Sequence, residues 1–236
     1  MNNISIIIPI YNEFGSIDSL YNEVSNTLKN VETYEIIFVD DSSTDKSNEL
    51  LRKYFNNKLI KAVFHYKNLG QSQALLSGIK IANHDTIVTL DGDGQNVPKD
   101  IPKLLKIYFS SKEIFLVSGI RQRRNDSTYK IISSKIANKI RSIILRDNCS
   151  DTGCGLKVFS KKIFLKFPFF NGIHRFLPAL FNGSGYKTIF THVSHRPRLM
   201  GVSKYGTFDR LFKGIVDIIR VMIIINIRRK EKWLTF

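Results

Sequence analysis

The sequence predicts an α/β fold in which helices flank a mainly parallel β-sheet. In the first hundred residues, short β-branched runs alternate with segments of helical spacing, which is typical of βαβ units. The strand runs are apolar at consecutive positions, as expected for strands that are buried on both faces. With 236 residues and 43% hydrophobic residues, the chain can bury a large core and is not expected to be disordered.

The elements of this first part follow one another at short intervals. We expect strands over residues 5–9, 35–40, 60–64, 86–91 and 114–118. Helices are expected over residues 17–28, 44–54, 70–82 and 98–109. Ser16 and either Ser43 or Thr44 are expected to start the first two helices, because Ser and Thr are favoured N-caps. Pro98 fits the first turn of the fourth helix.

The pattern is looser after residue 120, but no linker separates the two parts. We expect a basic helix over 129–146, strands over 153–159 and 187–193, a helical segment over 172–181, a loop over 193–205 and a long helix over 209–229. The later elements are therefore expected on the same sheet as the earlier ones. His174 and Arg175 would either contact the acceptor or begin a helix.

The net charge of +16 is unevenly distributed. Residues 1–100 carry 9 basic and 13 acidic side chains, whereas residues 101–236 carry 27 basic and 7 acidic ones. A basic half indicates a polyanionic partner, which is a nucleic acid, an anionic membrane surface or a phosphorylated substrate. Cys149 and Cys154 are too few for a disulfide scaffold and are expected to be buried thiols in a reducing compartment.

Three acidic clusters follow predicted strands. They are Pro9-Ile-Tyr-Asn-Glu13, Asp40-Asp41-Ser-Ser-Thr44 and Asp91-Gly-Asp93-Gly-Gln95. Ligands of open α/β sheets bind outside the carboxyl ends of the strands, where the strand order reverses. A single acidic cluster is explained by helix capping, but three that converge favour a functional site.

The third cluster has the chemistry of a cation site. Asp91, Asp93 and Gln95 supply the hard oxygen ligands that Mg²⁺ or Mn²⁺ prefers when it also binds phosphate. A calcium loop is excluded because Asn96 and Pro102 stand where Gly and Glu are required. The sequence contains neither a dinucleotide-binding G-x-G-x-x-G after the first strand nor a P-loop.

In their order along the chain, P-x-Y-N-E, V-D-D-x-S-x-D, N-x-G-x-x-x-A and D-G-D-x-Q resemble the motifs of family-2 glycosyltransferases of GT-A fold. The resemblance is to the subgroup of dolichyl-phosphate mannose synthases and bacterial polyprenyl-phosphate sugar transferases. Further matches are S-G-I-R at 118–121, D-T-G-C-G at 151–155, H-R-P-R at 195–198 and G-V-S-K-Y at 201–205. The matches extend over residues 4–208. Cys154 departs from the family, which often has Ser there.

The resemblance implies a role for each matching residue. The donor nucleotide would be held by Pro9, Tyr11, Glu13, Asp40, Asp41 and Asp91. The divalent metal and the diphosphate would be held by Asp91, Asp93 and Gln95. The acceptor phosphate would meet Arg121, with Lys130 and Ser133 or Ser134 as the best fits for the family's next basic residue and Ser. Ser203 and Lys204 would close over the donor as a lid, and Asp93, Arg121 and Lys204 would be the catalytic residues.

The chemistry of the residues agrees with a phosphate acceptor. A metal and Lys204 can stabilise a departing diphosphate without donating a proton. A lipid phosphate is already an anion and needs no general base, and the sequence lacks the acidic pair that serves as base in many hydroxyl-acceptor relatives. The resemblance thus implies an inverting transfer of a hexose, with mannose as the first guess, from a GDP- or UDP-sugar to a polyprenyl phosphate.

Two other functions are left open by the sequence. One is a family-2 glycosyltransferase that acts on a hydroxyl of a glycan or protein. The other is a basic α/β module that binds nucleic acid without catalysis. No RRM, KH or helix-turn-helix signature supports this module, so nucleic acid is not the expected partner.

The final helix is expected to lie in a membrane interface. The longest uncharged run there, residues 221–227, is far shorter than the ~20 residues that span a bilayer. Arg228, Arg229, Lys230 and Trp233 would lie at headgroup depth. The alternative is a helix packed on the sheet or on a partner subunit. We therefore expect a glycosyltransferase domain over 1–208 and an amphipathic segment over 209–236. The protein is expected to be peripherally attached to the cytoplasmic face of the membrane. The sequence leaves open whether it has a membrane partner protein or forms a homo-oligomer.

Overall fold

The structure is a computed structural model that describes residues 3–31, 33–54, 59–122, 139–198 and 208–233, with side chains of the last helix described for residues 214–229. The strands are β1 (Ile4–Ile10), β2 (Tyr34–Asp40), β3 (Ile60–Phe64), β4 (Thr86–Thr89), β5 (Ile114–Arg121), β6 (Lys157–Ser160) and β7 (Lys187–Val193). The longer helices are α1 (Phe14–Thr27), α2 (Ser47–Lys53), α3 (Gln71–Ile81), α4 (Ile101–Phe109), α7 (Leu177–Gly183) and α8 (Phe208–Trp233). Shorter turns are η2 (Pro98–Asp100), α6 (Lys161–Phe164) and η3 (Ile173–Arg175), and residues 139–145 are also helical.

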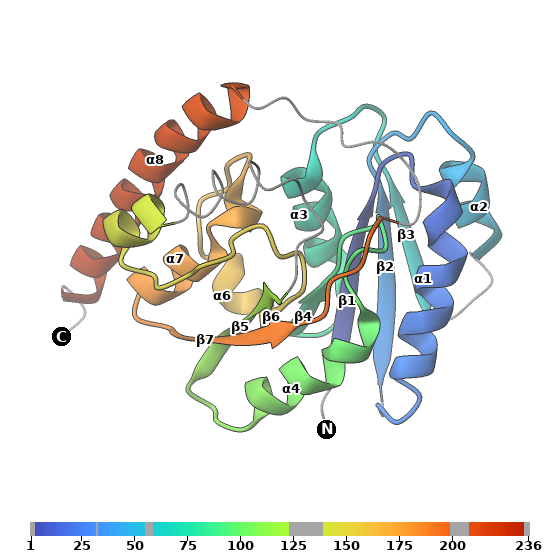
Figure 1. Cartoon of the computed structure of the whole chain (residues 1–236), viewed down its shortest axis with the longest axis horizontal. Coiled ribbons are helices and arrows are strands. Elements are labelled where there is room, and N and C mark those ends of the chain that lie inside the picture. The colour runs from blue at the N-terminus through green and yellow to red at the C-terminus, as the bar shows by residue number, and fades with distance from the viewer. Residues whose placement is uncertain (1–2, 32, 55–58, 123–138, 199–207, 234–236) are drawn as a thin grey trace.

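The described strands form one seven-stranded sheet in the order β3-β2-β1-β4-β6-β5-β7 (Figure 1). β1 pairs in parallel with both β2 and β4, so the chain first extends the sheet in one direction and then continues on the other side of β1. β6 is antiparallel to its two neighbours, β4 and β5. The prediction of a mainly parallel sheet that also contains the basic half of the chain is confirmed.

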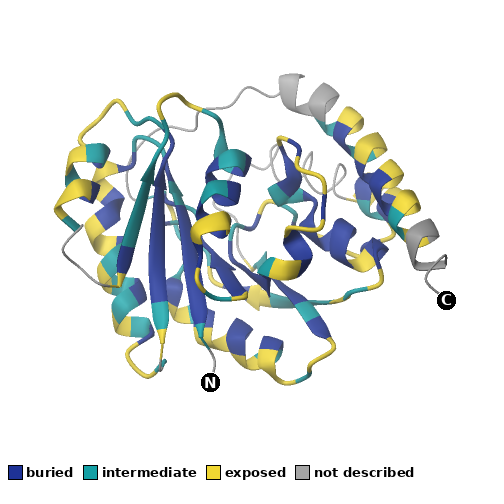
Figure 2. Ribbon diagram, turned by 180° about the vertical axis from the view of Figure 1, so that it is seen from behind, coloured by how far each residue is buried: buried dark blue, intermediate teal, exposed yellow. Residues whose placement is uncertain are grey.

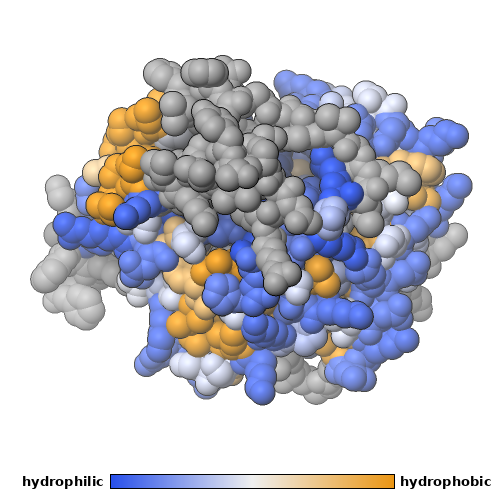
Figure 3. Space-filling model, viewed as in Figure 1, coloured by the Kyte–Doolittle hydropathy of each residue, from blue (hydrophilic) through white to orange (hydrophobic). Residues whose placement is uncertain are grey.

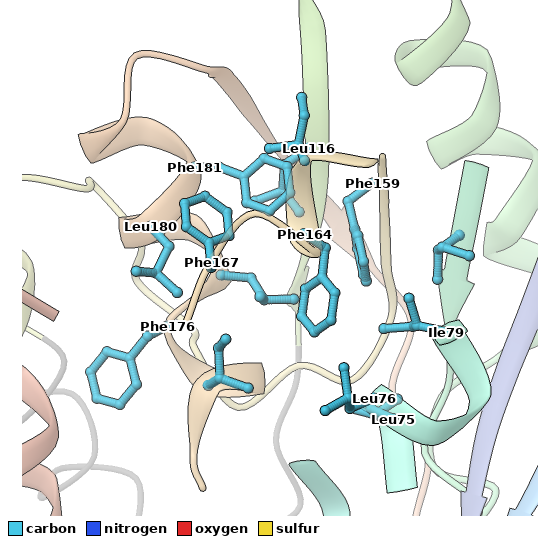
Figure 4. Close-up of a cluster of buried hydrophobic side chains, with 14 of the residues drawn as sticks. Leu75, Leu76, Ile79, Leu116, Phe159, Phe164, Phe167, Phe176, Leu180 and Phe181 are labelled. Carbon is cyan, nitrogen blue, oxygen red and sulfur yellow. The ribbon is translucent and has the colours of Figure 1, made fainter. Parts of the chain in front are cut away.

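Two apolar cores cover the two faces of the sheet. One is formed with α1, α2 and α4, and the other with α3, α6, α7 and α8. The second core is rich in aromatic rings, among them Phe159, Phe164, Phe167 and Phe181 (Figure 4). The inner strands β1, β2, β4 and β6 are almost entirely buried, whereas the edge strands β3 and β7 are largely half-buried, and many exposed residues lie on the outer faces of the helices (Figure 2). Strands covered on both sides have the consecutive apolar residues noted above.

Helix starts were the least accurate part of the prediction. α1 begins at Phe14, before Ser16, and the hydroxyl of Ser16 lies 2.5 Å from the carbonyl oxygen of Gly92. The hydroxyl of Ser43 accepts a hydrogen bond from the Asn12 amide, and α2 begins only at Ser47. These serines were predicted as N-caps, but instead they hold the loops after β1, β2 and β4 together. Such distant partners cannot be recognised from local sequence.

α8 confirms the predicted long helix, which packs on the protein with one side and exposes apolar residues on the other. Its inner side packs on α7, where a Cβ at Gly183 would lie 2.5 Å from Ile225. Val221, Ile224 and Ile225 are buried there. Asp217 is also buried on this side and pairs with Arg175 at 3.2 Å. A carboxylate is tolerated on the inner face of α8 because Arg175 of η3 forms an ion pair with it.

Candidate active site

Six strands end at one edge of the sheet. Of the seven described strands only β6 runs in the opposite direction, so the other six have their carboxyl ends at this edge. The three acidic clusters therefore meet at the switch point between β1 and β4, as predicted. They are tightly packed, since a Cβ at Gly92 would lie 2.5 Å from the carbonyl oxygen of Pro9.

The loops that follow β1 and β2 are joined by hydrogen bonds. The side-chain oxygen of Asn12 accepts from the Thr44 amide at 2.7 Å, and the hydroxyl of Ser47 accepts from the Glu13 amide at 3.1 Å. Beside them is an open hollow of about 570 Å³, lined by Asn12, Glu13, Phe14, Gly15, Thr44, Asp45, Lys46 and Glu49. Of the residues predicted to hold the nucleotide, Glu13 alone is among those that line this hollow.

Asp40 ends β2 and is fully buried. Its carboxylate accepts hydrogen bonds from the Ser43 amide at 3.2 Å and from the side-chain amide of Asn48 at 3.0 Å. Pro9 and Tyr11, which lie at and just after the end of the neighbouring β1, are partly exposed. The structure thus places the predicted nucleotide-binding residues together, with Asp40 behind them as a fixed support.

Asp41 organises the loop before α3. One carboxylate oxygen is 2.7 Å from Nδ1 of His65 and accepts from the Leu69 amide, and the other accepts from the Gly70 amide at 2.7 Å. Gly70 has a φ of +88°, which glycine adopts without strain. Asp41 was predicted to hold the nucleotide, and its observed contacts show that it shapes the loop that leads into α3.

Asp91 is fixed from three sides. Its carboxylate accepts a hydrogen bond of 2.8 Å from the side-chain amide of Gln71, at the start of α3. Its backbone amide donates to the side chain of Asn96 at 2.9 Å. Gly155 lies behind it, because a Cβ there would be only 2.3 Å from the Asp91 carboxylate. Asp93 accepts from the Gln95 amide at 3.0 Å, which closes the turn.

The two carboxylates of this turn repel each other. Burial raises the pKa of Asp91 to about 6, and the nearby charge of Asp93 adds to the rise. The charges of Lys157 and Arg121 and the hydrogen bond from Gln71 lower it again without cancelling the effect. Burial and the neighbouring carboxylate both disfavour the charged form of Asp91, and a cation bound at this turn would favour it.

Two arginines from the segment after β7 reach the acidic edge. A guanidinium nitrogen of Arg198 lies 2.7 Å from Oε1 of the buried Glu13 and 3.5 Å from Oδ2 of Asp93. Arg196 donates to the Gly94 carbonyl at 2.6 Å and forms an ion pair with Glu23 at 2.8 Å. The H-R-P-R motif that contains both arginines was noticed in the sequence but given no role. Its partners lie at least a hundred residues earlier in the sequence, so local pattern does not reveal them.

Arg121 is held at the end of β5 by Asp151. Its Nε and one terminal nitrogen donate to the two carboxylate oxygens of Asp151 at 2.7 and 2.6 Å. Burial would lower the pKa of Arg121, but this ion pair more than compensates and raises it. A bidentate pair fixes the plane of the guanidinium. Arg121 is thus a permanently charged and oriented group near Asp91, where the sequence predicts the acceptor phosphate.

Comparison with known proteins identifies the family. Residues 5–167 match the family model described as glycosyl transferase family 2. The chain belongs to the family-2 glycosyltransferases.

The sequence of this glycosyltransferase aligns over nearly its whole length with two curated relatives. The chain is 32% identical over 231 residues to the undecaprenyl-phosphate 4-deoxy-4-formamido-L-arabinose transferase of Aeromonas hydrophila subsp. hydrophila. This alignment covers 94% of this chain and 70% of the relative. The chain is 33% identical over 233 residues to the dodecaprenyl-phosphate galacturonate synthase of Rhizobium johnstonii, covering 96% and 68%. The resemblance drawn from the sequence motifs is confirmed.

Solved structures confirm the GT-A fold of the glycosyltransferase. One is the glucosyl-3-phosphoglycerate synthase of Mycobacterium tuberculosis in complex with Mn²⁺, UDP and glucosyl-3-phosphoglycerate. It aligns with a TM-score of 0.68 at 17% identity, over 94% of this chain and 78% of that one. At this identity the likeness establishes the fold alone.

The glycosyltransferase also contains a buried lysine that sequence reasoning missed. Lys157, at the start of β6, is 3% exposed, and its ammonium donates to the Cys154 carbonyl. It lies opposite Thr89 and Ser118 in the sheet, and its charge acts on Asp91. No described carboxylate forms an ion pair with it. A lysine inside an apolar strand was the signal available in the sequence, because buried lysines are rare unless they have a role.

The residues present fit a divalent cation. Asp91 and Asp93 repel each other, and the guanidinium of Arg198 already lies beside the Asp93 carboxylate. The turn is thus a place where a positive charge interacts favourably. Within the described ranges no three His, Cys, Asp or Glu side chains form a metal-binding group. Mg²⁺ is commonly bound by one or two carboxylates together with substrate phosphates. The amide of Gln95, whose nitrogen is 3.4 Å from the Arg196 carbonyl, can offer its oxygen as a further ligand.

Part of the predicted site lies outside the described residues. These residues are Lys130, Ser133, Ser134, Ser203 and Lys204. Their predicted roles at the acceptor phosphate and in the lid stay predictions. Two aspartates of this region have basic partners: Asp151 pairs with Arg121, and Asp147 pairs with the buried Arg141.

Proposed function

We propose that this glycosyltransferase moves a sugar from a nucleotide-diphosphate donor to a polyprenyl phosphate, with inversion at the sugar carbon. The observation that carries the proposal is the pairing of Asp91 and Asp93 at the switch point with fixed cations, among them Arg121, around them. The names of the two relatives support a polyprenyl phosphate as acceptor. A glycan or protein hydroxyl as acceptor remains the alternative.

The site would hold the donor with Asp91, Asp93 and Gln95 through Mg²⁺ or Mn²⁺. A bound divalent cation would offset the negative charge that develops on the leaving diphosphate. Arg121, fixed by Asp151, would orient the acceptor phosphate so that one oxygen attacks the sugar carbon as the bond to the diphosphate breaks. Lys204 and Ser203 would close over the donor, and Lys130 and Ser133 would assist Arg121. No proton has to be removed from a phosphate nucleophile.

The sugar and the base of the donor are the finer part of the proposal. Mannose from a GDP donor is the first guess of the sequence. The relatives are named for formamidoarabinose and galacturonate. A thermal-shift screen of GDP- and UDP-sugars with Mn²⁺ identifies the donor, since a ligand that binds the native state raises its apparent stability.

Asp93→Asn tests the catalytic proposal. We expect it to abolish Mn²⁺-dependent binding of the nucleotide diphosphate in calorimetry and the transfer of radiolabelled sugar into organic-extractable lipid. Glu113→Gln is the matched control, because that carboxylate is exposed and far along the chain from the acidic turn. Unchanged binding by Asp93→Asn would refute the metal site, and label that stays in the aqueous phase would favour the hydroxyl acceptor.

We further propose that residues 1–208 form the catalytic domain and that residues 209–236 attach it to an anionic membrane surface. The outer side of α8 is apolar, with exposed Ile215, Val216, Ile219, Met222, Ile223 and Ile227 (Figure 3). Ile140, Ile143 and Ile144 are also exposed on the helical residues 139–145. No described helix is both long and apolar enough to cross a bilayer. Arg228 and Arg229, predicted at headgroup depth, donate to the Lys166 and Gly183 carbonyls.

A further inference from the structure

His174 is connected to the acidic edge through the first turn of α3. Its Nδ1 lies 2.7 Å from the hydroxyl oxygen of Ser72, the second residue of that helix. The first residue, Gln71, donates to Asp91. Lys157 acts electrostatically on both Asp91 and His174. The imidazole is therefore linked to Asp91 through two adjacent residues of α3, although it comes from a segment about a hundred residues further along the chain.

Hydrogen bonding assigns the proton of this imidazole. The Gly172 amide donates to the Ser72 hydroxyl oxygen at 2.8 Å. Of the acceptors described around Ser72, only Nδ1 of His174 is within reach of its single hydroxyl proton. Nδ1 is then an acceptor, and the proton of the neutral ring is on Nε2. Burial, followed by the charges of Arg175 and Lys157, lowers the pKa of His174 to about 3, so the ring is neutral near pH 7.

The Nε2–H group has no partner among the described residues. The only described hydrogen bond of His174 is made by Nδ1, and the residue is partly exposed, so its other nitrogen is not sealed in the core. Ser72, itself held by the Gly172 amide, fixes the ring at its Nδ1 side. The result is one N–H donor with a fixed direction next to the acidic edge.

We propose that Nε2–H of His174 donates a hydrogen bond to an oxygen of a bound substrate, either on the transferred sugar or on the phosphate that receives it. The inference rests on the proposed function and adds a contact that the acidic turn does not supply. The group serves as a neutral donor that orients the substrate, and it neither gives up nor takes a proton during transfer. Its neutrality suits this place, where Lys157 and Arg175 already supply positive charge.

Two substitutions separate this role from a purely structural one. In His174→Asn the amide can still meet Ser72, but the donor at the Nε2 position is lost. In His174→Gln the amide reaches the Nε2 position, but the bond to Ser72 is lost. We expect His174→Asn to keep wild-type thermal stability and to raise KM for one substrate roughly three- to tenfold, the effect of one neutral hydrogen bond. His174→Gln should lose stability and keep more of that affinity. The reverse pattern would overturn the proposal.

Nitrogen-15 NMR of the histidine ring identifies the substrate. We expect the free wild-type protein to show a protonated Nε2 and an unprotonated Nδ1, and Ser72→Ala to disturb this state. UDP and GDP, the corresponding glucose conjugates, and farnesyl phosphate in micelles are added separately with Mn²⁺. A shift with a conjugate but not with its nucleotide assigns the bond to the sugar, and a shift with farnesyl phosphate assigns it to the acceptor. A protonated Nδ1, or a signal that moves with none of these probes, would overturn the proposal. If Asp93→Asn abolishes nucleotide binding while His174→Asn changes nothing, only the present inference fails.

Discussion

Replacing Gly155 by Ala should damage the active site more than the fold. An ideal Cβ at this position lies 2.3 to 2.4 Å from three atoms of the Asp91 carboxyl group. Ordinary contacts need ~3.5 Å, so one of the two groups has to move by ~1 Å. The backbone of Gly155 cannot retreat easily, because its carbonyl accepts a hydrogen bond of 2.6 Å from the hydroxyl of Thr89. The carboxylate of Asp91 is therefore the group that moves.

The expected magnitudes differ for stability and for catalysis. Overpacking of this kind costs ~1–3 kcal/mol of unfolding free energy, which lowers Tm by several degrees in a protein of this size. A misplacement of ~1 Å at a reacting centre costs ~100-fold in rate. We expect Gly155→Ala to remain folded, to bind nucleotide with Mn²⁺ at least tenfold more weakly and to transfer sugar ~100-fold more slowly.

Calorimetric titration with Mn²⁺ and nucleotide, a denaturation curve and the lipid-extraction assay measure these effects. Gly214→Ala in α8 is the matched control, because a Cβ there meets nothing within 4 Å. Alanine favours a helix over glycine by ~1 kcal/mol, so the control should be as stable as the wild type or more so. A folded Gly155→Ala protein with wild-type nucleotide affinity and rate would show that the position of Asp91 does not matter.

Three further predictions concern other parts of the molecule. Burial would raise the pKa of Glu35, but hydrogen bonds, above all with Lys61, outweigh burial and lower the pKa. The ionised Glu35 therefore stabilises the folded state above its unfolded pKa, and this stabilisation is lost as the pH falls below ~4. Denaturant unfolding at pH 7 and 3 should show a smaller loss for Glu35→Gln than for the wild type, and equal losses would contradict this. Asp151→Asn should cost ~3 kcal/mol and raise KM for the acceptor, because it leaves the half-buried Arg121 without its counter-ion. An unchanged KM in steady-state assays would contradict the assigned role. Replacing Ile219 on the outer side of α8 by Asn should weaken sedimentation with anionic vesicles ~10-fold or more, whereas the same change at the exposed Ile81 on α3 should not.

The parts of the fold and site that local pattern determines were predictable. Consecutive apolar residues located the central strands, and the acidic turns at their ends followed from the rule that parallel strands share a carboxyl edge. The position of Asp91 and Asp93 at the switch point needed no contact information beyond this. The long final helix was also predicted from its spacing, and the structure places it at Phe208–Trp233.

The parts that depend on distant partners were not predictable. Ser16 is of a residue type that is favoured as an N-cap, yet its hydroxyl donates a hydrogen bond to a carbonyl oxygen 76 residues away in the sequence. Asp217 is a polar residue in an otherwise largely apolar helix, and a single sequence does not reveal that Arg175 pairs with it. In both cases a polar side chain has two chemically equivalent uses. The choice between them is made by tertiary contacts, which periodicity does not contain.

The uneven charge of the chain has a structural explanation in the site. The acidic groups at the edge, including Asp91 and Asp93, come from the first hundred residues, whereas the cations beside them, Arg121, Lys157 and Arg198, come from the basic remainder. The antiparallel β6 and the parallel β5 and β7 bring these cations to the edge where β1, β2 and β4 end. A divalent cation that enters together with a diphosphate changes the net charge of this site little, whereas either one alone leaves a charge unbalanced. The asymmetry that first suggested a nucleic-acid partner is thus accounted for in part by two halves of one site for a phosphorylated substrate.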